Sequence, residues 1–455
     1  MTLSKLYGPY GRRLRQLFYL VTPWETMYSS LDEVPEFTDE AIPWFIFLII
    51  LEVFYCWKKA IKGSYNLNDT MTSLGAGFVQ TMVKLALRTI EISLYVWVYE
   101  HWSVYRLPSD SALAWLLTFV AMDFCYYWMH RGAHEINIFW AFHQTHHSSE
   151  YYNLSTALRQ SAFQQQIAIL FYLPQALFIS PHMHMTHEVL NRLYQFWIHT
   201  PTINRLGPIE WILNTPSHHR VHHGRNRYCI DKNYAGVFII WDRMFGTFQP
   251  ELESSPVVYG LTQNINSYDA SKIQLSYLWH ILFEKVPSVN GIPNKLKTVF
   301  FGPGWSVGKP RLGDLNDIPE ITYPVRKYHS GVSGWISIYV FVQGSFSVIA
   351  YDSFAKKLKL LPWSVSIQFA AAMVFSTYVL GGIMEKSRWC PYLEIIRCLS
   401  FFFWVFPMVW PQGHLLSFLQ VAMQISLLIW VVAMVASRRN VALFKLNGHG
   451  KSCAH

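Results

Sequence analysis

Long apolar segments, separated by short polar ones, set the pattern along this chain. The first strongly apolar segment covers residues 41–57, with acidic residues before it and three lysines after it. Further apolar segments follow the polar middle of the chain, at 335–351, 364–383, 398–411 and 414–436. Runs of this length and hydropathy are typical of helices that cross a bilayer, so the pattern predicts a multi-span helical bundle.

The segments between these two regions are less uniform. Residues 110–129 predict another span, whereas residues 75–99 carry charges at helical spacing. That second segment either spans by burying its charges against other helices or lies partly in the membrane interface. Residues 162–180 and 183–198 are separated by Ser180-Pro181, which predicts a helical hairpin that dips into the bilayer.

Composition agrees with a membrane protein. Only 14% of the residues are charged, against about 25% in soluble domains, while 52% are hydrophobic and 17% are aromatic. These values exclude a disordered or coiled-coil chain and favour an all-α integral membrane protein. We expect four parts: a lumenal N-terminal segment (1–40), a membrane-embedded catalytic domain (41–330) whose residues 200–330 are membrane-peripheral, a C-terminal block of transmembrane helices (331–437) and a cytoplasmic tail (438–455).

The formal net charge is +9. No dense basic run accompanies this charge, so loops that face the anionic cytoplasmic leaflet explain it better than a nucleic-acid surface does. The six cysteines are scattered and form no CxxC pair. The sequence therefore predicts neither nucleic-acid binding nor a disulfide framework.

Eight of the 19 histidines fall into three short motifs. The motifs are His130-Arg-Gly-Ala-His134, His143-Gln-Thr-His146-His147 and His219-Arg-Val-His222-His223. On a helix, residues at i, i+3 and i+4 share a face, so each motif directs two or three imidazoles toward one point. Three such faces can enclose two metal ions with about four nitrogens each, and neutral imidazole favours Zn, Fe, Cu or Ni over Mg or Ca.

Surface histidines beside lipid headgroups would explain a single motif of this kind. Three motifs, two of them with identical HxxHH spacing, argue against that interpretation. His187 and His199 lie on the second arm of the predicted hairpin, and His199 is the better candidate for an accessory ligand. Other histidines lack the motif spacing and are expected to have other roles: His182, His184, His218, His280, His329, His414, His449 and His455.

Two carboxylates near the first motif are further candidates. An ionisable residue in an apolar segment is a functional candidate by default, and Asp123 shares a helical stripe with His130. Its carboxylate could accept an imidazole N–H and fix the tautomer of a ligand; a carboxylate that only caps or solvates the helix is the alternative. Glu135 follows His134 and so faces away from the ligand side, either in solvent or toward a second substrate.

The three histidine motifs are similar to the eight-histidine signature of the fatty-acid hydroxylase/sterol desaturase superfamily. Downstream, Asn233-Tyr234 and Trp241–Thr247 resemble the end of that signature, which makes Asn233 and Asp242 candidates for residues that support the ligands from behind. Within the superfamily, the chain most resembles the alkylglycerol monooxygenase family. The similar stretches are FHQTHHSS (142–149), NLSTALRQS (153–161), YQFWIHT (194–200), residues 214–241 and GPGWSVGKPRLG (302–313).

This resemblance implies a diiron monooxygenase that uses O2 and tetrahydrobiopterin. It would hydroxylate the ether-linked carbon of a 1-O-alkylglycerol, and the hemiacetal would break down to a fatty aldehyde and a glycerol derivative. The eight motif histidines would bind the irons, with His199 as a further candidate, and Glu135 would bind the pterin. We expect a multi-pass protein of the endoplasmic reticulum membrane, whose partners are the lipid substrate, membrane lipids, O2 and, indirectly, a pterin-recycling enzyme.

Two alternatives stay open. A sterol or fatty-acyl hydroxylase or desaturase of the same superfamily would take its electrons from cytochrome b5. A membrane metal transporter would carry ionisable residues along several spans, whereas here the histidines gather at one end of the predicted bundle.

The charged flanks predict the topology. Lysines after the first span and Arg438-Arg439 after the last are expected in the cytoplasm, which places the N-terminus in the lumen and both histidine-rich regions in the cytoplasm. Single cysteines engineered near residues 150, 230 and 445 should all react with a membrane-impermeant thiol reagent from the cytosolic side. A split result would show that a span has been miscounted.

Overall fold

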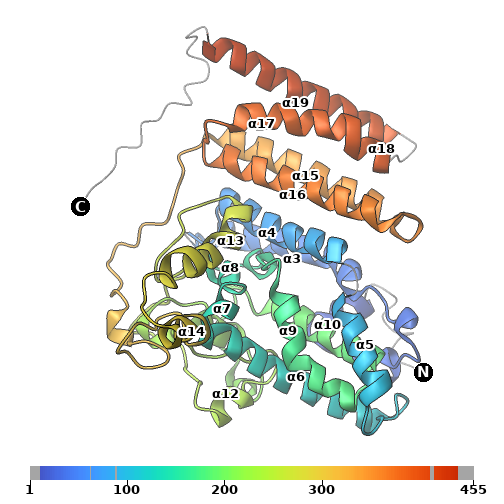
Figure 1. Cartoon of the computed structure of the whole chain (residues 1–455), viewed down its shortest axis with the longest axis vertical. Helices are drawn as coiled ribbons and strands as arrows, with labels where there is room; N and C mark the ends of the chain where they lie inside the picture. The colour runs from blue at the N-terminus through green and yellow to red at the C-terminus, as the bar shows by residue number, and fades with distance from the viewer. Residues whose placement is uncertain (1–10, 62, 88–89, 410–413, 439–455) are drawn as a thin grey trace. The chain divides into compact units, whose positions relative to one another are not determined.

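The computed structural model describes residues 11–61, 63–87, 90–409 and 414–438, which contain helices and no strands. The expected tail 438–455 lies outside these residues beyond Arg438. Two isolated β-bridges join Leu213 to Phe238 and Gly224 to Tyr259. The chain divides into two compact units, both helical, and the all-α prediction is confirmed (Figure 1).

The first unit consists of Met1–Gly77, Arg88–Ile265 and Gln274–Lys327. Its longer helices are α3 (Phe37–Lys58), the first half of α4 (Leu67–Leu87), α5 (Ile90–Trp102), α6 (Ala112–Glu135), α9 (Gln164–Tyr172), α10 (Pro181–Trp197) and α14 (Ile292–Phe300). Short helices lie between them: α2 (Pro23–Thr26), α7 (Asn137–Trp140), α8 (Gln144–His147), α11 (Pro216–His222) and α12 (Ile240–Met244). Helix α13 (Ala270–His280) contributes residues to both units.

Helices α6 and α10 form the centre of the first unit and pack against each other (Figure 1). Helix α6 begins at Ser111, whose hydroxyl accepts the N–H of Ala114 and so caps the helix. Helix α10 begins at Pro181, a favoured first residue because proline has no N–H to leave unpaired. Buried aromatic and aliphatic side chains, among them Trp115 and Leu190, form the core between α3, α6 and α10.

The structure refines the helices expected from the sequence. The segment predicted at 110–129 continues to Glu135, so α6 itself carries the first histidine motif. Residues 75–99 form parts of two helices, α4 and α5, and the predicted hairpin turns at Ser180-Pro181. Among the residues that the structure describes, six helical segments are long and apolar enough to cross a membrane: Leu31–Lys58, Ala112–Glu135, Gly334–Ala355, Trp363–Met384, Cys390–Met408 and Ser417–Val435.

The second unit contains the C-terminal helices, which pack in sequence order. They are α15 (Gly334–Ala355), α16 (Trp363–Met384), α17 (Cys390–Ser400), α18 (Phe406–Val409) and α19 (His414–Arg438), with a π-helical turn (Phe401–Val405) between α17 and α18. The helical segment predicted at 398–411 in fact begins at Cys390. The prediction began too late because the charged residues Glu394 and Arg397 lower the hydropathy of its first turns. These two side chains are fully buried and pair with each other at 2.6 Å, so their charges do not keep the helix out of the core.

Candidate functional site: two groups of converging histidines

The three histidine motifs occupy three different elements of the first unit. His130 and His134 lie one turn apart near the end of α6. The second motif begins directly before the four-residue helix α8, and the third lies at the end of the seven-residue helix α11. Only the first motif therefore belongs to a long helix, and the tertiary fold places the other two.

The structure brings nine buried imidazoles together in two groups, and within each group the ring nitrogens lie within 4.8 Å of one another. The five-histidine group consists of His130, His134, His143, His147 and His222. The four-histidine group consists of His146, His199, His219 and His223. All eight motif histidines are present, and His199 joins them.

The two HxxHH motifs are each shared between the groups. In every motif, the histidines at i and i+4 belong to the same group, because four residues turn a helix by about 400° and return to nearly the same face. In the two HxxHH motifs, the histidine at i+3 belongs to the other group. His146 belongs to the four-histidine group, unlike His143 and His147, and His222 belongs to the five-histidine group, unlike His219 and His223. Each HxxHH motif therefore links both groups, whereas His130 and His134 belong to the five-histidine group alone.

Backbone carbonyls orient several of these rings from behind. The Nδ1 atoms of His130, His146, His199 and His222 lie 2.7–3.0 Å from the carbonyl oxygens of Tyr234, Arg159, Gln195 and Lys232, respectively. The His143 Nδ1 lies 3.1 Å from the side-chain oxygen of Gln164. Because a carbonyl oxygen only accepts, each Nδ1 must carry the proton, and Nε2 keeps its lone pair.

These lone pairs point at one another. Nε2 of His146 and Nε2 of His199 are 3.2 Å apart, although neither atom has a proton to donate. Such a contact is repulsive unless a cation lies between the two nitrogens. Nitrogens that share one metal ion at about 2.0–2.1 Å lie roughly 3 Å from each other, so the spacing of this donor set fits a metal.

Burial keeps the histidines neutral. It lowers the pKa of His146 to about 4. Burial, followed by repulsion from neighbouring imidazoles, lowers the pKa values of His147, His219 and His223 well below the usual range. The rings are therefore unprotonated at neutral pH without a metal, which is the form that binds one.

The two histidines left open by the sequence have different surroundings. His199 Nε2 lies 3.0 Å from His219 and 3.1 Å from His223. His187 instead contacts the hydroxyl of Tyr19, 2.7 Å from its Nδ1, and belongs to neither group. His187 lies within α10, ten residues and about 15 Å of helix before its last residue Trp197, whereas His199 follows the end of the helix, so the two are too far apart to reach one centre.

The expected contact of Asp123 with an imidazole is wrong. Its carboxylate accepts the backbone N–H groups of Val237 and Phe238, the indole N–H of Trp241 and the amide N–H of Asn191, at 2.7–2.9 Å. Asp123 lies about 10 Å before His130 along the helix axis, out of reach of the ring. It supports the site indirectly, because it anchors the segment that follows Tyr234, the residue whose carbonyl orients His130.

Asn233 and Asp242 fasten the same segment from its other end. The Asp242 carboxylate accepts the backbone N–H groups of Tyr234 and Ala235. Asn233 adopts a left-handed conformation, with φ of 57°, and its amide donates to the carbonyls of His218 and Gln249. Both side chains therefore hold backbone atoms rather than an imidazole of the two groups.

Glu135 lies beside the five-histidine group but outside it, as its helical position predicts. Its Oε1 accepts from Arg131 Nε at 2.7 Å, and its Oε2 accepts from Arg311 Nη1 at 3.1 Å. A further carboxylate, Asp231, was not predicted from the sequence; its Oδ1 lies 3.8 Å from His134 Nδ1. Its position two residues before Asn233, in the segment already singled out, could have marked it as a candidate.

The fold and the site define a class of protein: helical proteins with several candidate membrane spans, built around clustered histidines that could hold metal. The family model that matches the chain is fatty acid hydroxylase, over residues 115–247. This range contains all nine converging histidines, together with Asp123 and Asp242. No solved structure matches the chain.

Relatives that match most of the chain narrow the class. The chain is 46% identical to the alkylglycerol monooxygenase of Danio rerio, over 85% of this chain and 86% of that protein. It is 45% identical to the human alkylglycerol monooxygenase over 88% of each chain, and 37% identical to that of Caenorhabditis elegans over 85% of this chain and 80% of the relative. The chain belongs to the alkylglycerol monooxygenase family, and it is an enzyme, a lipid monooxygenase.

Replacing any one of the nine converging histidines by alanine should abolish nearly all turnover and lower the metal content, because each removes one nitrogen from a closely spaced donor set. Metal analysis and product formation on equally expressed variants measure the effect. His218→Ala is the matched control: His218 is buried beside His219, but its ring faces Phe248. Near-normal turnover in two or more of the nine variants would contradict a two-centre metal site.

Proposed function

We propose that the two histidine groups hold two iron ions and that the chain is a tetrahydrobiopterin-dependent monooxygenase of 1-O-alkylglycerols. The observation that carries the proposal is the pair of unprotonated nitrogens of His146 and His199, 3.2 Å apart, each backed by a carbonyl. The relatives named alkylglycerol monooxygenase support the substrate class.

Iron held by imidazoles supplies the activation of O2. The protein itself contributes orientation, because carbonyls behind His130, His146, His199 and His222 fix the ring planes. It also contributes a neutral donor set, because all nine ligand candidates are uncharged imidazoles and none is a carboxylate. Burial of the nine rings keeps bulk water away from them.

The proposed reaction inserts one oxygen atom of O2 into the C–H bond next to the ether oxygen. The other oxygen atom leaves as water, and the reduced pterin supplies the two electrons. The resulting hemiacetal breaks its bond between carbon and the former ether oxygen, which yields a fatty aldehyde and a glycerol derivative. A membrane-embedded enzyme suits this substrate, since the alkyl chain stays in lipid while a polar pterin arrives from water.

We further propose that Glu135 binds the pterin. A carboxylate accepts paired N–H groups from a pterin ring, and Glu135 lies beside the five-histidine group without belonging to it. Arg311, with 46% of its side chain exposed, binds Glu135 Oε2. A bound pterin would replace Arg311 at this oxygen or bind the oxygen together with it. Arg131 keeps the other carboxylate oxygen in place.

The proposed location is the endoplasmic reticulum membrane, with both histidine groups facing the cytoplasm. Lys58 ends the first candidate span and Lys59 follows it, and these two positive charges support this orientation. The same orientation would give a pterin-recycling enzyme access to the product of the reaction.

The test of the proposed function is metal and product analysis on purified protein. We expect about two irons per chain, and fatty aldehyde from a 1-O-alkylglycerol only when tetrahydrobiopterin is present. Turnover driven by cytochrome b5 without pterin would favour a sterol or fatty-acyl hydroxylase. Metal uptake into vesicles without any oxidation would favour a transporter.

Glu135→Gln keeps the size of the side chain but removes the charge that pterin N–H groups favour. Losing a charged hydrogen-bond partner costs about 1.5–3 kcal/mol, so KM for tetrahydrobiopterin should rise roughly 10- to 100-fold, with iron content and KM for the lipid nearly unchanged. Glu188→Gln is the control, because Glu188 forms a comparable i,i+4 pair with Arg192. An effect on the lipid alone would move Glu135 to the substrate site, and loss of iron would make it part of the metal centre.

A further inference from the structure

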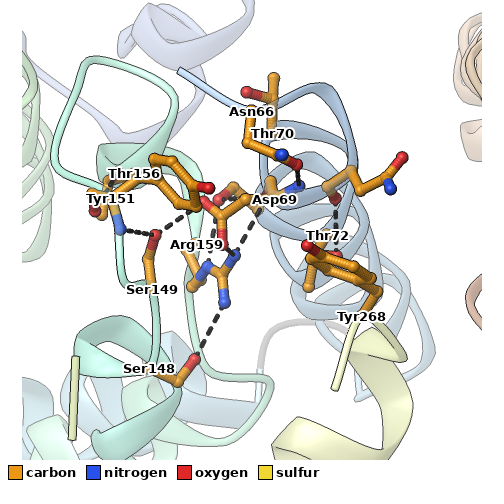
Figure 2. A network of polar contacts seen from close by, with 12 residues as sticks. Asn66, Asp69, Thr70, Thr72, Ser148, Ser149, Tyr151, Thr156, Arg159 and Tyr268 are labelled. Atoms are coloured by element: carbon orange, nitrogen blue, oxygen red, sulfur yellow. Dashed lines mark hydrogen bonds and ion pairs between the residues drawn. The ribbon is translucent and has the colours of Figure 1, made fainter. Parts of the chain in front are cut away.

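A buried polar network connects α4 to the loop that follows the second histidine motif (Figure 2). On α4, Asp69, Ser73 and Gly77 follow at intervals of four residues and so share one face. The loop approaches this face closely: the carbonyl oxygen of Leu158 leaves no room for a Cβ at Gly77. Arg159, the next residue, reaches into the network.

The guanidinium of Arg159 is 1% exposed and makes several charged hydrogen bonds. Nη2 pairs with Asp69 Oδ1 at 2.6 Å and also donates to the Asp69 carbonyl at 3.1 Å. Nε donates to the Ser73 hydroxyl at 3.0 Å, and Nη1 donates to the Ser148 hydroxyl at 3.1 Å. Burying such a charge is costly unless it is paired and hydrogen-bonded, and here it is both.

The same network holds the end of the second histidine motif. Ser149 donates its hydroxyl hydrogen to Asp69 Oδ2 at 2.7 Å, as Figure 2 shows. Ser148 and Ser149 directly follow His147. Asp69 therefore joins α4 to both ends of the loop between His147 and Arg159.

The main chain of Arg159 has a separate role, because its carbonyl accepts the Nδ1 proton of His146 at 3.0 Å. His199 is oriented differently: its acceptor, the Gln195 carbonyl, lies within the long helix α10, which fixes it. Arg159 only follows a three-residue 3-10 helix, Thr156–Leu158. The position of its carbonyl therefore depends on the anchor that its side chain makes to α4.

We propose that the Arg159–Asp69 ion pair is a positioning pair for the four-histidine group: it fixes the carbonyl that holds His146 in the tautomer and orientation that metal binding needs. The inference rests on the proposed function, in that the groups bind iron. Partners behind a metal ligand typically change metal affinity 10- to 100-fold when removed. The effect should fall on the group that contains His146.

The experiment is a chelator titration of purified, iron-loaded protein, followed by iron content and by thermal unfolding. Arg159→Met should release part of the iron at a roughly 10- to 100-fold lower chelator concentration. Arg159→Lys, which keeps the charge but loses the forked donors, should fall between this variant and the wild type. Ser73→Ala removes one hydrogen bond and should show a smaller shift in the same direction.

Two controls separate positioning from general stability. Arg397→Met breaks a buried ion pair in the other unit, and it should lower the unfolding temperature without a shift in the chelator profile. In a His146→Ala background, Arg159→Met should cause no further iron loss, because both changes act through the same ring.

A wild-type chelator profile in both Arg159→Lys and Arg159→Met, or additive loss in the His146→Ala background, would overturn the inference alone. A wild-type protein that holds no iron would overturn the proposed function and the inference with it. If Arg159→Met does not fold, Arg159→Lys and Ser73→Ala still decide the question.

Discussion

The site depends on one electrostatic constraint: unprotonated nitrogens must be held facing one another. The backbone carbonyls of Tyr234, Arg159, Gln195 and Lys232 each accept a hydrogen bond from the single N–H group of one ring. The lone pairs on the other side then repel, and the fold must keep them close until a cation occupies the space between them. Buried polar side chains hold the backbone segments that carry these carbonyls in place.

Carboxylates hold this supporting backbone in place, and none of them belongs to the two histidine groups. Asp123 and Asp242 bind the N–H groups of the segment that contains Tyr234, and Asp69 holds Arg159. Their negative charges are satisfied by hydrogen bonds at a distance from the imidazoles. The donor set that would hold a metal is therefore made of neutral imidazoles alone.

Both units bury charge by the same means. Arg159 pairs with Asp69 in the first unit, and Arg397 pairs with Glu394 in the second, each with additional hydroxyl or amide partners. A buried pair with satisfied hydrogen bonds adds little stability over an apolar core, but removal of one partner leaves an uncompensated charge.

The sequence by itself determined the helical membrane class, the three histidine motifs and the family, because hydropathy and the i, i+4 spacing are local properties. It did not show how the HxxHH motifs divide: His146 and His222 join the other group because the tertiary fold brings the short helices α8 and α11 together. It also misplaced the contact of Asp123 and left His199 undecided. The contacts of α6 depend on a loop more than a hundred residues later in the chain, which places a carbonyl beside His130 and an N–H beside Asp123. Local sequence patterns do not predict contacts between segments so far apart.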